Sequence, residues 1–242
     1  AARLSIKIGT WVGLVGIVLT LWTGDGSAVN VARVQPMKLA AMEGLYDGKV
    51  GQELVGFGFV NTDKKPGDNL PAIHAEISIP YGLSVLANHD PNSFVPGIND
   101  LIKGVSLTPQ GDTINTVSYA ERISMGREAR EALAAYSTAR KSGDESAAVA
   151  ALKTLRDNYK YFGYGYFDEP ADAVPPVATT FYSFRVMVIT GGYLLLLFVM
   201  LIFVYYRKPE FLEKPWLHWV CIISIPLVWI CSQAGWVLAE VG

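Results

Sequence analysis

The chain has 242 residues, of which 51% are hydrophobic and 12% aromatic, and its mean hydropathy is +0.28. This composition is more apolar than that of an ordinary soluble domain. The net charge of −2 and the lack of a basic face exclude a nucleic-acid partner from the expected functions.

Three apolar runs dominate the sequence, and no charged residue interrupts them before Glu240. They cover Ile8 to Trp22, Val186 to Tyr206 and Trp216 to Val241. About 20 helical residues cross a hydrocarbon core roughly 30 Å thick. The second and third runs reach that length, and the first reaches it when the residues from Leu4 onward extend it. We therefore predict transmembrane helices over residues 4–23, 185–206 and 216–242, with a loop at 207–215.

Neither a soluble core nor a cleaved signal peptide accounts well for these runs. Buried helices of a soluble core are usually amphipathic, whereas residues 194–203 have no polar face. A cleaved signal peptide would need a small-residue cleavage site after Trp22, which the sequence lacks. Cys221 and Cys231 lie about 15 Å apart along the third helix, too far for a disulfide.

Short basic flanks predict the orientation. Cationic residues precede the first run and fill the link between the second and third, namely Arg3, Lys7, Arg207, Lys208 and Lys214. Short loops rich in Lys and Arg face the cytoplasm. Because successive spans alternate direction, residues 24–184 are expected outside the cytoplasm, in a multi-pass membrane protein.

The region 24–184 is too long for a plain loop and has its own structural signals. A short helix is predicted from Pro36, and strands over 55–60 and 75–79 flank a turn-rich segment. Two apolar stripes, separated by a turn at Arg140 to Asp144, predict a helical hairpin. The first contains Met125, Ala129, Ala132, Leu133 and Tyr136, and the second Val149, Leu152, Leu155 and Tyr159. The expected fold class is an all-α integral membrane protein in which three helices of a larger bundle carry an inserted, mainly helical extracytoplasmic domain.

Polar groups at membrane depth are the first candidates for chemistry. Glu240 follows Trp236 by four residues, which places both side chains on one helix face. An acid inside a membrane usually marks a bundle interior, a proton path or a metal centre. The alternative is that Glu240 has already emerged at the outer surface.

Arg185 and Met187 form a second candidate pair at the outer end of the middle span. A thioether can bind haem iron and a guanidinium can pair with a propionate. Gly191 and Gly192, one turn deeper, would let a flat macrocycle or another helix approach the backbone. The alternatives are that Met187 fills space, that Arg185 snorkels to the surface, and that the glycines serve helix packing.

Lys38 and Glu43 form a third pair, on the short helix beyond the first span. Five residues separate them, so the usual helix-stabilising ion pair does not explain them. They are either solvated surface charges or a cation and an acid that bind a quinol headgroup and take its protons. His74, His89 and His218 have no neighbouring ligand at metal-site spacing and are expected to be surface or interfacial residues.

The segment from Val34 to Glu43, which reads VQPMKLAAME, closely resembles the start of the quinol loop in subunit I of the cytochrome bd quinol oxidases. Five further segments agree with that family in chain order: Gly24-Asp25, Ile79-Pro80-Tyr81, Gly163-Tyr164-Gly165, Phe184-Arg185-Val186-Met187, and Gly235-Trp236 through Glu240. The resemblance covers essentially the whole chain but only the middle of the family's subunit, which has further helices with histidine ligands. The chain departs at Gly26, where family members can carry an acid, and this affects the role expected of Asp25.

The resemblance implies a role for each candidate residue. Met187 would be the axial ligand of a low-spin haem b, with Arg185 beside that haem. Glu240 would be the acidic ligand of a high-spin haem, either haem b or haem d, with Trp236 between the haem centres. Lys38 and Glu43 would bind and oxidise quinol, with Asp25 as a further candidate at that site.

The function implied is that of a terminal respiratory oxidase, which oxidises quinol at the outer membrane face, reduces oxygen to water and generates a proton motive force. Its partners would be quinol, oxygen, a second oxidase subunit and the lipid bilayer, and the chain alone would be inactive. One alternative is a non-catalytic membrane protein whose outer helical domain binds a partner. Another is a quinol-using haem protein that passes electrons to an acceptor other than oxygen.

Overall fold

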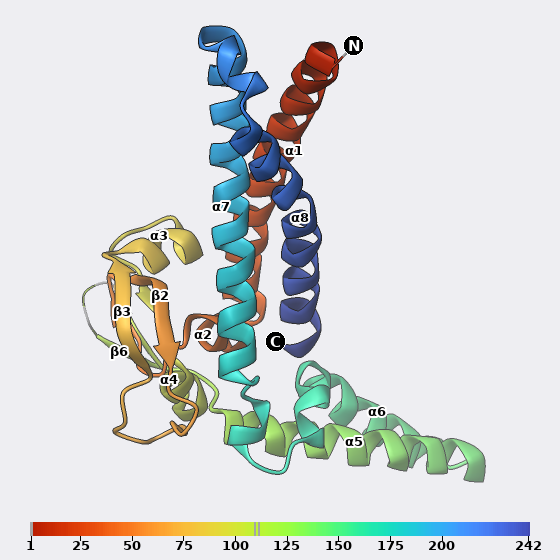
Figure 1. Cartoon of the computed structure of the whole chain (residues 1–242). Coiled ribbons are helices and arrows are strands. Elements are labelled where there is room, and N and C mark those ends of the chain that lie inside the picture. The colour runs from red at the N-terminus through yellow and green to blue at the C-terminus, as the bar shows by residue number, and fades with distance from the viewer. Residues whose placement is uncertain (1, 109, 111) are drawn as a thin grey trace.

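A computed structural model describes residues 2–108, 110 and 112–242. Three of its helices are long and apolar enough to cross a membrane: α1 (Ala2–Val34), α7 (Val177–Arg207) and α8 (Pro215–Val241) (Figure 1). About half of the remaining chain is helical too. The expected class, a helical membrane protein with a domain inserted between its first two spans, is confirmed.

Helix α1 runs further than the span predicted for it. Its 33 residues continue through Gly24, Asp25 and Gly26 to Val34, a length of about 50 Å that exceeds the hydrocarbon thickness. A helical glycine costs only about 1 kcal/mol, so the two glycines do not end the helix. Pro36 does, because the residue before a proline avoids the helical conformation, and Gln35 accordingly has φ −131° and ψ 58°.

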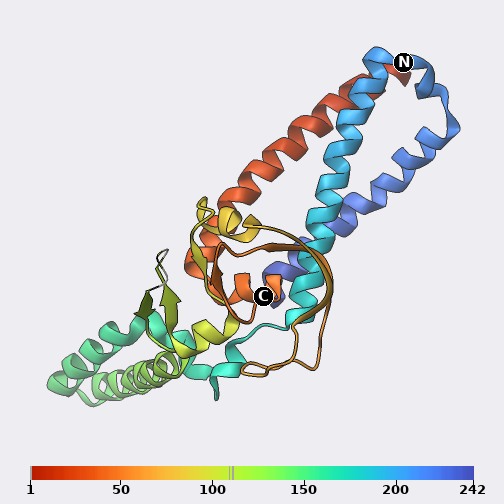
Figure 2. The same cartoon turned by 90° about the vertical axis from the view of Figure 1, so that its left-hand side faces the viewer.

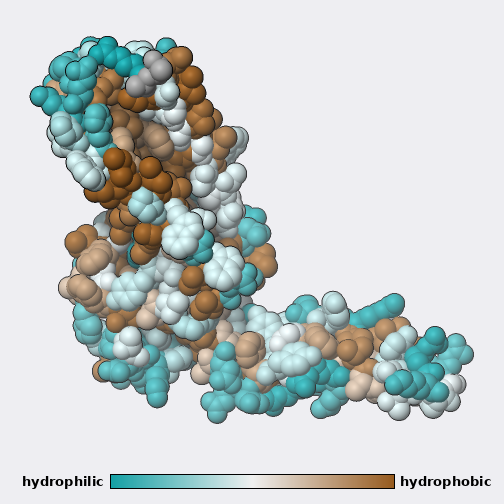
Figure 3. All heavy atoms as spheres, turned by 45° about the vertical axis from the view of Figure 1, so that its right-hand side comes forward, coloured by the Kyte–Doolittle hydropathy of each residue, from teal (hydrophilic) through white to brown (hydrophobic). Residues whose placement is uncertain are grey.

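The basic flanks of the spans lie together at one end of the bundle. The N-terminus of α1 and the link through the short helix η3 (Pro209–Glu213) share that end, opposite the inserted domain (Figures 1 and 2). Arg3 and Glu213 form an exposed ion pair of 3.0 Å there. Figure 3 shows this hydrophilic end and an apolar surface on the helices next to it.

Between α1 and α7 the chain forms a series of mostly short elements near the N-terminal end of α7. They are α2 (Pro36–Glu43), β1 (Lys49–Val50), β2 (Leu54–Val60), β3 (Ile73–Ile79), α3 (Gly82–Asn88), β4 (Phe94–Val95), α4 (Ile98–Lys103), β5 (Val105–Leu107), β6 (Thr113–Asn115), α5 (Tyr119–Ser142), α6 (Glu145–Asn158), η1 (Tyr159–Tyr166) and η2 (Pro170–Ala173).

The strands form three antiparallel pairs, β1 with β4, β2 with β3 and β5 with β6. The pair β2–β3 confirms the two predicted strands, with Leu54 opposite Ile79 and Phe57 opposite Ile77. The other strands have only two or three residues each. Such short segments show no alternation of apolar and polar residues, so the sequence did not predict them.

The predicted helical hairpin is confirmed as α5 and α6, which project sideways in Figure 1. Gly143 ends α5 with φ +74°, and Asp144 caps α6 by accepting a hydrogen bond from the amide of Ala147. The predicted stripes are wrong in part, since Leu133 and Val149 are exposed. The segment η1 packs along α5 and shifts the buried face of α5 to Ile123, Gly126 and Ala129.

The contact between α5 and η1 depends on two glycines. A Cβ atom at Gly126 would lie 2.3 Å from the backbone nitrogen of Gly165 and 2.4 Å from the carbonyl oxygen of Tyr161. Gly126→Ala is therefore expected to destabilise the protein by about 1–3 kcal/mol through overpacking, measured as a lower melting temperature. Gly163→Ala is the matched control, because a Cβ there meets nothing within 4 Å. Equal melting temperatures for the two variants would contradict the expectation.

A hydrophobic cluster joins the inserted domain to the spanning helices. It contains Leu39 and Met42 of α2, Leu83 of α3 and Leu238 of α8, with Met187 of α7 packed against it. The cluster holds α2 between α7 and the end of α8. Of the candidate site residues, Met187 packs against this cluster, and Glu43 and Arg185 lie beside Met42.

Candidate functional site

A buried ion pair connects α2 to α7. One guanidinium nitrogen of Arg185 (Nη2) lies 2.7 Å from Glu43 Oε2, and the other (Nη1) donates to Glu43 Oε1 at 3.3 Å and to the Met42 carbonyl at 3.2 Å. Glu43 is 2% exposed and Arg185 5% exposed. The alternatives of a solvated Glu43 and a snorkelling Arg185 are therefore wrong. Because burial removes the water that would solvate these charges, each charge depends on the other.

The surroundings of Arg185 are aromatic on two sides. Its guanidinium carbon lies 4.3 Å from the centroid of the Phe181 ring and 5.1 Å from that of Phe184. The remaining nitrogen, Nε, is buried without a hydrogen-bond partner among the described residues. A buried donor without an acceptor is rare in native proteins, so Arg185 has capacity for one more hydrogen bond.

The protonation of Glu43 is finely balanced. Burial raises the pKa of its carboxyl group, and the nearby guanidinium of Arg185 lowers it, with a net rise from 4.5 to about 7. Burial dominates because a lone carboxylate is costly in an apolar interior. A group with such a pKa exchanges protons readily near neutral pH, as a general base must.

Lys38, the expected partner of Glu43, points elsewhere. Its Nζ donates to the carbonyl of Ala239 in the last turn of α8 at 2.9 Å. A cation near a helix C-terminus is favourable, because free carbonyls and the helix dipole both attract it. The structure thus does not bring Lys38 and Glu43 together, and α2 carries them to two different helices.

Met187 lies at the contact between α7 and α8. Its Sδ lies 3.3 Å from the position that a Cβ atom would take at Gly235, so the missing side chain lets the sulfur approach α8. Trp236 is 61% exposed, and Glu240 is exposed as well. Neither residue shares the face of α8 on which Gly235 and Leu238 pack. A Cβ at Gly191 or Gly192 would meet nothing within 4 Å, so space is open beside both.

Asp25 has a partner that the sequence did not suggest. Its carboxylate lies 3.2–3.3 Å from Nε2 of His89, which ends α3 with φ +55°. This contact joins α1 to the inserted domain. His218 contacts the carbonyl of Leu212 at 2.7 Å. No group of three metal-ligating His, Cys, Asp or Glu side chains occurs among the described residues.

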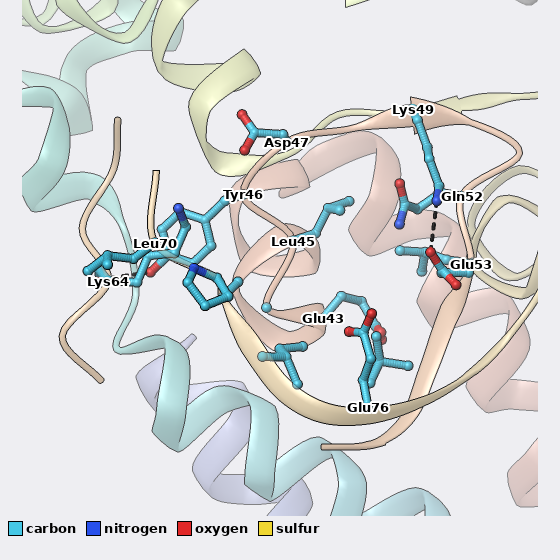
Figure 4. A pocket seen from close by; sticks show the side chains of 16 residues that line it. Glu43, Leu45, Tyr46, Asp47, Lys49, Gln52, Glu53, Lys64, Leu70 and Glu76 are labelled. Carbon is cyan, nitrogen blue, oxygen red and sulfur yellow. Dashed lines mark hydrogen bonds and ion pairs between the residues drawn. The ribbon is translucent and has the colours of Figure 1, made fainter. Parts of the chain in front are cut away.

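Glu43 also lines a pocket of about 390 Å³ in the inserted domain (Figure 4). Its wall includes Lys49 from β1, Gln52 and Glu53 from the link between β1 and β2, and Glu76 from β3. Lys49 and Glu53 form an ion pair of 2.8 Å at its edge. Gln52 and Glu76 could not be found from the sequence, because neither belongs to a motif and the fold alone brings them near Glu43.

Taken together, these features define a multi-pass helical membrane protein whose inserted domain has a carboxyl-lined pocket next to the ion pair between α2 and α7. The family model for cytochrome bd terminal oxidase subunit I matches residues 1–242. The chain belongs to that family.

Individual relatives agree with this assignment. The chain is 31% identical over 238 residues to cytochrome bd-II ubiquinol oxidase subunit 1 of Escherichia coli, covering 98% of this chain and 45% of that protein. It is 25% identical over 240 residues to cytochrome bd ubiquinol oxidase subunit 1 of Bacillus subtilis, covering 98% of this chain and 37% of that one. The chain therefore spans less than half the length of these relatives.

A solved structure shares the fold. The bd oxidase from Geobacillus thermodenitrificans superposes with a TM-score of 0.56 at 22% identity, over 99% of this chain and 37% of the other. At that identity the likeness shows the arrangement of helices and does not assign individual residues.

Proposed function

We propose that the chain is part of a quinol:oxygen oxidoreductase of the bacterial inner membrane, which oxidises quinol outside and reduces oxygen to water. The observation that carries this proposal is the carboxyl group of Glu43, buried beside a pocket and next to the start of the membrane span α7. The relatives of the chain are named as ubiquinol oxidase subunits. Membership of an oxidase family favours this function over a non-catalytic membrane anchor.

Quinol oxidation yields two electrons and two protons, and each product needs a path. Glu43 is placed to accept a proton, because its pKa is raised to about 7 and it opens on the pocket. Arg185 stabilises the carboxylate before the proton arrives. With residues 24–184 outside the cytoplasm, protons released into the pocket would leave on the outer side and contribute to a proton motive force. Trp236 would assist electron transfer between haem centres.

The electrons require haem, which we assign as a low-spin haem b, a high-spin haem b and a haem d. When bound, these groups pass electrons singly and deliver them to oxygen. Met187 would hold the low-spin haem and Glu240 a high-spin haem. The unpartnered Nε of Arg185 and the open space beside Gly191 fit a propionate and a ring near α7. The chain would supply one ligand to each haem, and the other ligands would come from the rest of the subunit, which acts with a second subunit.

The proposal is tested by oxygen consumption of the full-length subunit in its complex, supplied with quinol. Quinol-dependent oxygen uptake, together with carbon monoxide binding to a high-spin haem, is the expected result. A pigment that is reduced by quinol but binds no carbon monoxide and consumes no oxygen would favour electron transfer to a different acceptor. The absence of any pigment would favour the non-catalytic anchor.

Lys38→Ala gives a sharper test of the quinol site. Lys38 lies on α2 with Glu43, and its hydrogen bond to the Ala239 carbonyl joins this helix to the end of α8. We expect Lys38→Ala to lower quinol turnover at least about tenfold, which corresponds to the free energy of one charge-assisted hydrogen bond. The reduced-minus-oxidised haem spectrum should stay intact. Lys153→Ala, on the exposed side of α6, is the control. Unchanged turnover in Lys38→Ala would remove this residue from the site.

A further inference from the structure

Gln52 is held rigidly at the edge of the pocket by its backbone. Its amide donates to the Ser84 hydroxyl at 2.8 Å, and its carbonyl accepts from the amides of Leu83 and Ser84 at 3.1 and 3.2 Å. These bonds tie the link between β1 and β2 to the first turn of α3. The backbone of Gln52, and with it the direction in which the side chain leaves the main chain, is therefore fixed by the fold before any ligand binds.

The side-chain amide of Gln52 is buried without a matching group. The residue is 7% exposed, it lines the pocket, and its Oε1 has no hydrogen-bond partner among the described residues. Figure 4 shows the amide at the pocket, across from Glu43. Buried acceptors in native proteins almost always have a donor. The missing donor is most simply supplied by a molecule that fills the pocket.

The rest of the pocket wall is mixed in character. Aliphatic side chains line part of it, namely Leu45, Val55, Ile73 and Leu83, and charged side chains line other parts, among them Asp47, Lys64 and Glu76. A pocket of about 390 Å³ lies in the size range of small-molecule sites. The aliphatic part of the wall thus suits a flat ring that carries a hydroxyl group near Gln52 and a second polar group near Glu43.

We propose that Oε1 of Gln52 accepts a hydrogen bond from one ring hydroxyl of the quinol and thereby selects the reduced substrate. This inference rests on the proposed function and adds a specificity residue to it. A quinol carries an O–H donor for this acceptor, whereas the quinone product carries only carbonyl oxygens. Oxidation removes this donor, so the hydrogen bond to Oε1 is lost in the product.

The test uses Gln52→Leu in the full-length complex, because leucine keeps the volume and removes the acceptor. We expect the KM for quinol to rise about tenfold, the effect of one hydrogen bond. The inhibition constant of the matching quinone should change far less. A KM that stays the same, or a KM and an inhibition constant that rise equally, would overturn the proposal.

A stability measurement separates this role from a structural one. Asn99 is buried to a similar degree, at 6% exposed, but its side chain is satisfied by Asp47 and by the amide of Gly67 at 2.8 Å each. Asn99→Leu should therefore lower the melting temperature, while Gln52→Leu should leave it unchanged or raise it. A fall in Gln52→Leu as large as that in Asn99→Leu would assign Gln52 a purely structural role and overturn the proposal.

The failure of this inference is distinguishable from failure of the proposed function. If Lys38→Ala and Glu43→Gln lower quinol turnover while Gln52→Leu leaves the KM unchanged, only the role of Gln52 is lost. If the complex consumes no oxygen with quinol at all, the proposed function fails and the role of Gln52 fails with it.

Discussion

Glu43→Ala is expected to be the most destabilising single change in the inserted domain. It would leave the guanidinium of Arg185, now 2.7 Å from Glu43, buried with no counter-charge. Removing one partner of a buried pair typically costs about 3–5 kcal/mol. The measurement is the melting temperature of the detergent-solubilised complex. Replacing both residues, as in Glu43→Ala with Arg185→Met, should recover much of the loss because no unpaired charge remains.

An exposed ion pair serves as the control for this prediction. Arg3 and Glu213 lie 3.0 Å apart, but their side chains are 67% and 74% exposed. Water screens such a pair, and its loss usually costs less than about 1 kcal/mol. Glu213→Ala should therefore leave the melting temperature nearly unchanged. An equally small effect of Glu43→Ala would contradict the importance assigned to the buried pair.

The raised pKa of Glu43 also predicts opposite pH dependences of stability and activity. In the folded protein this pKa is about 7 rather than 4.5, so the folded state binds the proton more tightly than the unfolded state does. The resulting contribution to stability is complete below about pH 4.5 and is lost as the pH rises through 7. In the proposed reaction the unprotonated carboxylate accepts the proton of the quinol, so kcat/KM should rise over that same interval near pH 7.

Glu43→Gln provides the comparison, because the amide keeps the shape and does not titrate. Both the fall in stability and the rise in kcat/KM near pH 7 should disappear in this variant. Persistence of the same inflection in kcat/KM would assign it to a group other than Glu43.

The spanning helices could be predicted because hydropathy is a local property. Long uncharged runs such as that from Val186 to Tyr206 identify a membrane helix without knowledge of any neighbour. The turn between α5 and α6 was also predictable, because Gly143 and Asp144 act on the backbone next to them. The ends of α1 and α7 were less predictable, because a helix continues past the membrane wherever no proline ends it.

The partners within the site could not be predicted, because they are distant in the sequence. Glu43 and Arg185 lie 142 positions apart, and their pairing depends on how α2 docks against α7. The motifs identified both residues individually, but they predicted a haem propionate as the partner of Arg185 and a quinol as the partner of Glu43. No sequence pattern identified Gln52 as a site residue, because glutamine is common in loops and only the fold shows that this one is buried.

Met187→Leu in the full-length subunit is expected to abolish the low-spin haem b signal in a reduced-minus-oxidised spectrum. The thioether of methionine can bind iron, and the leucine side chain cannot. The two side chains are similar in volume, so the packing of Met187 against Gly235 should survive at a cost below about 1.5 kcal/mol. The loss of the signal should therefore occur in a complex that still assembles.

Met200→Leu is the matched control, because Met200 lies on the same helix α7 and is also half-buried, within an aliphatic cluster. It should keep the complete haem spectrum. If both variants kept the low-spin signal, Met187 would be a packing residue and the axial ligand would have to come from another part of the subunit. If both lost it, the signal would depend on the packing of α7 and would carry no information about the ligand. Only the selective loss in Met187→Leu assigns iron binding to this sulfur atom.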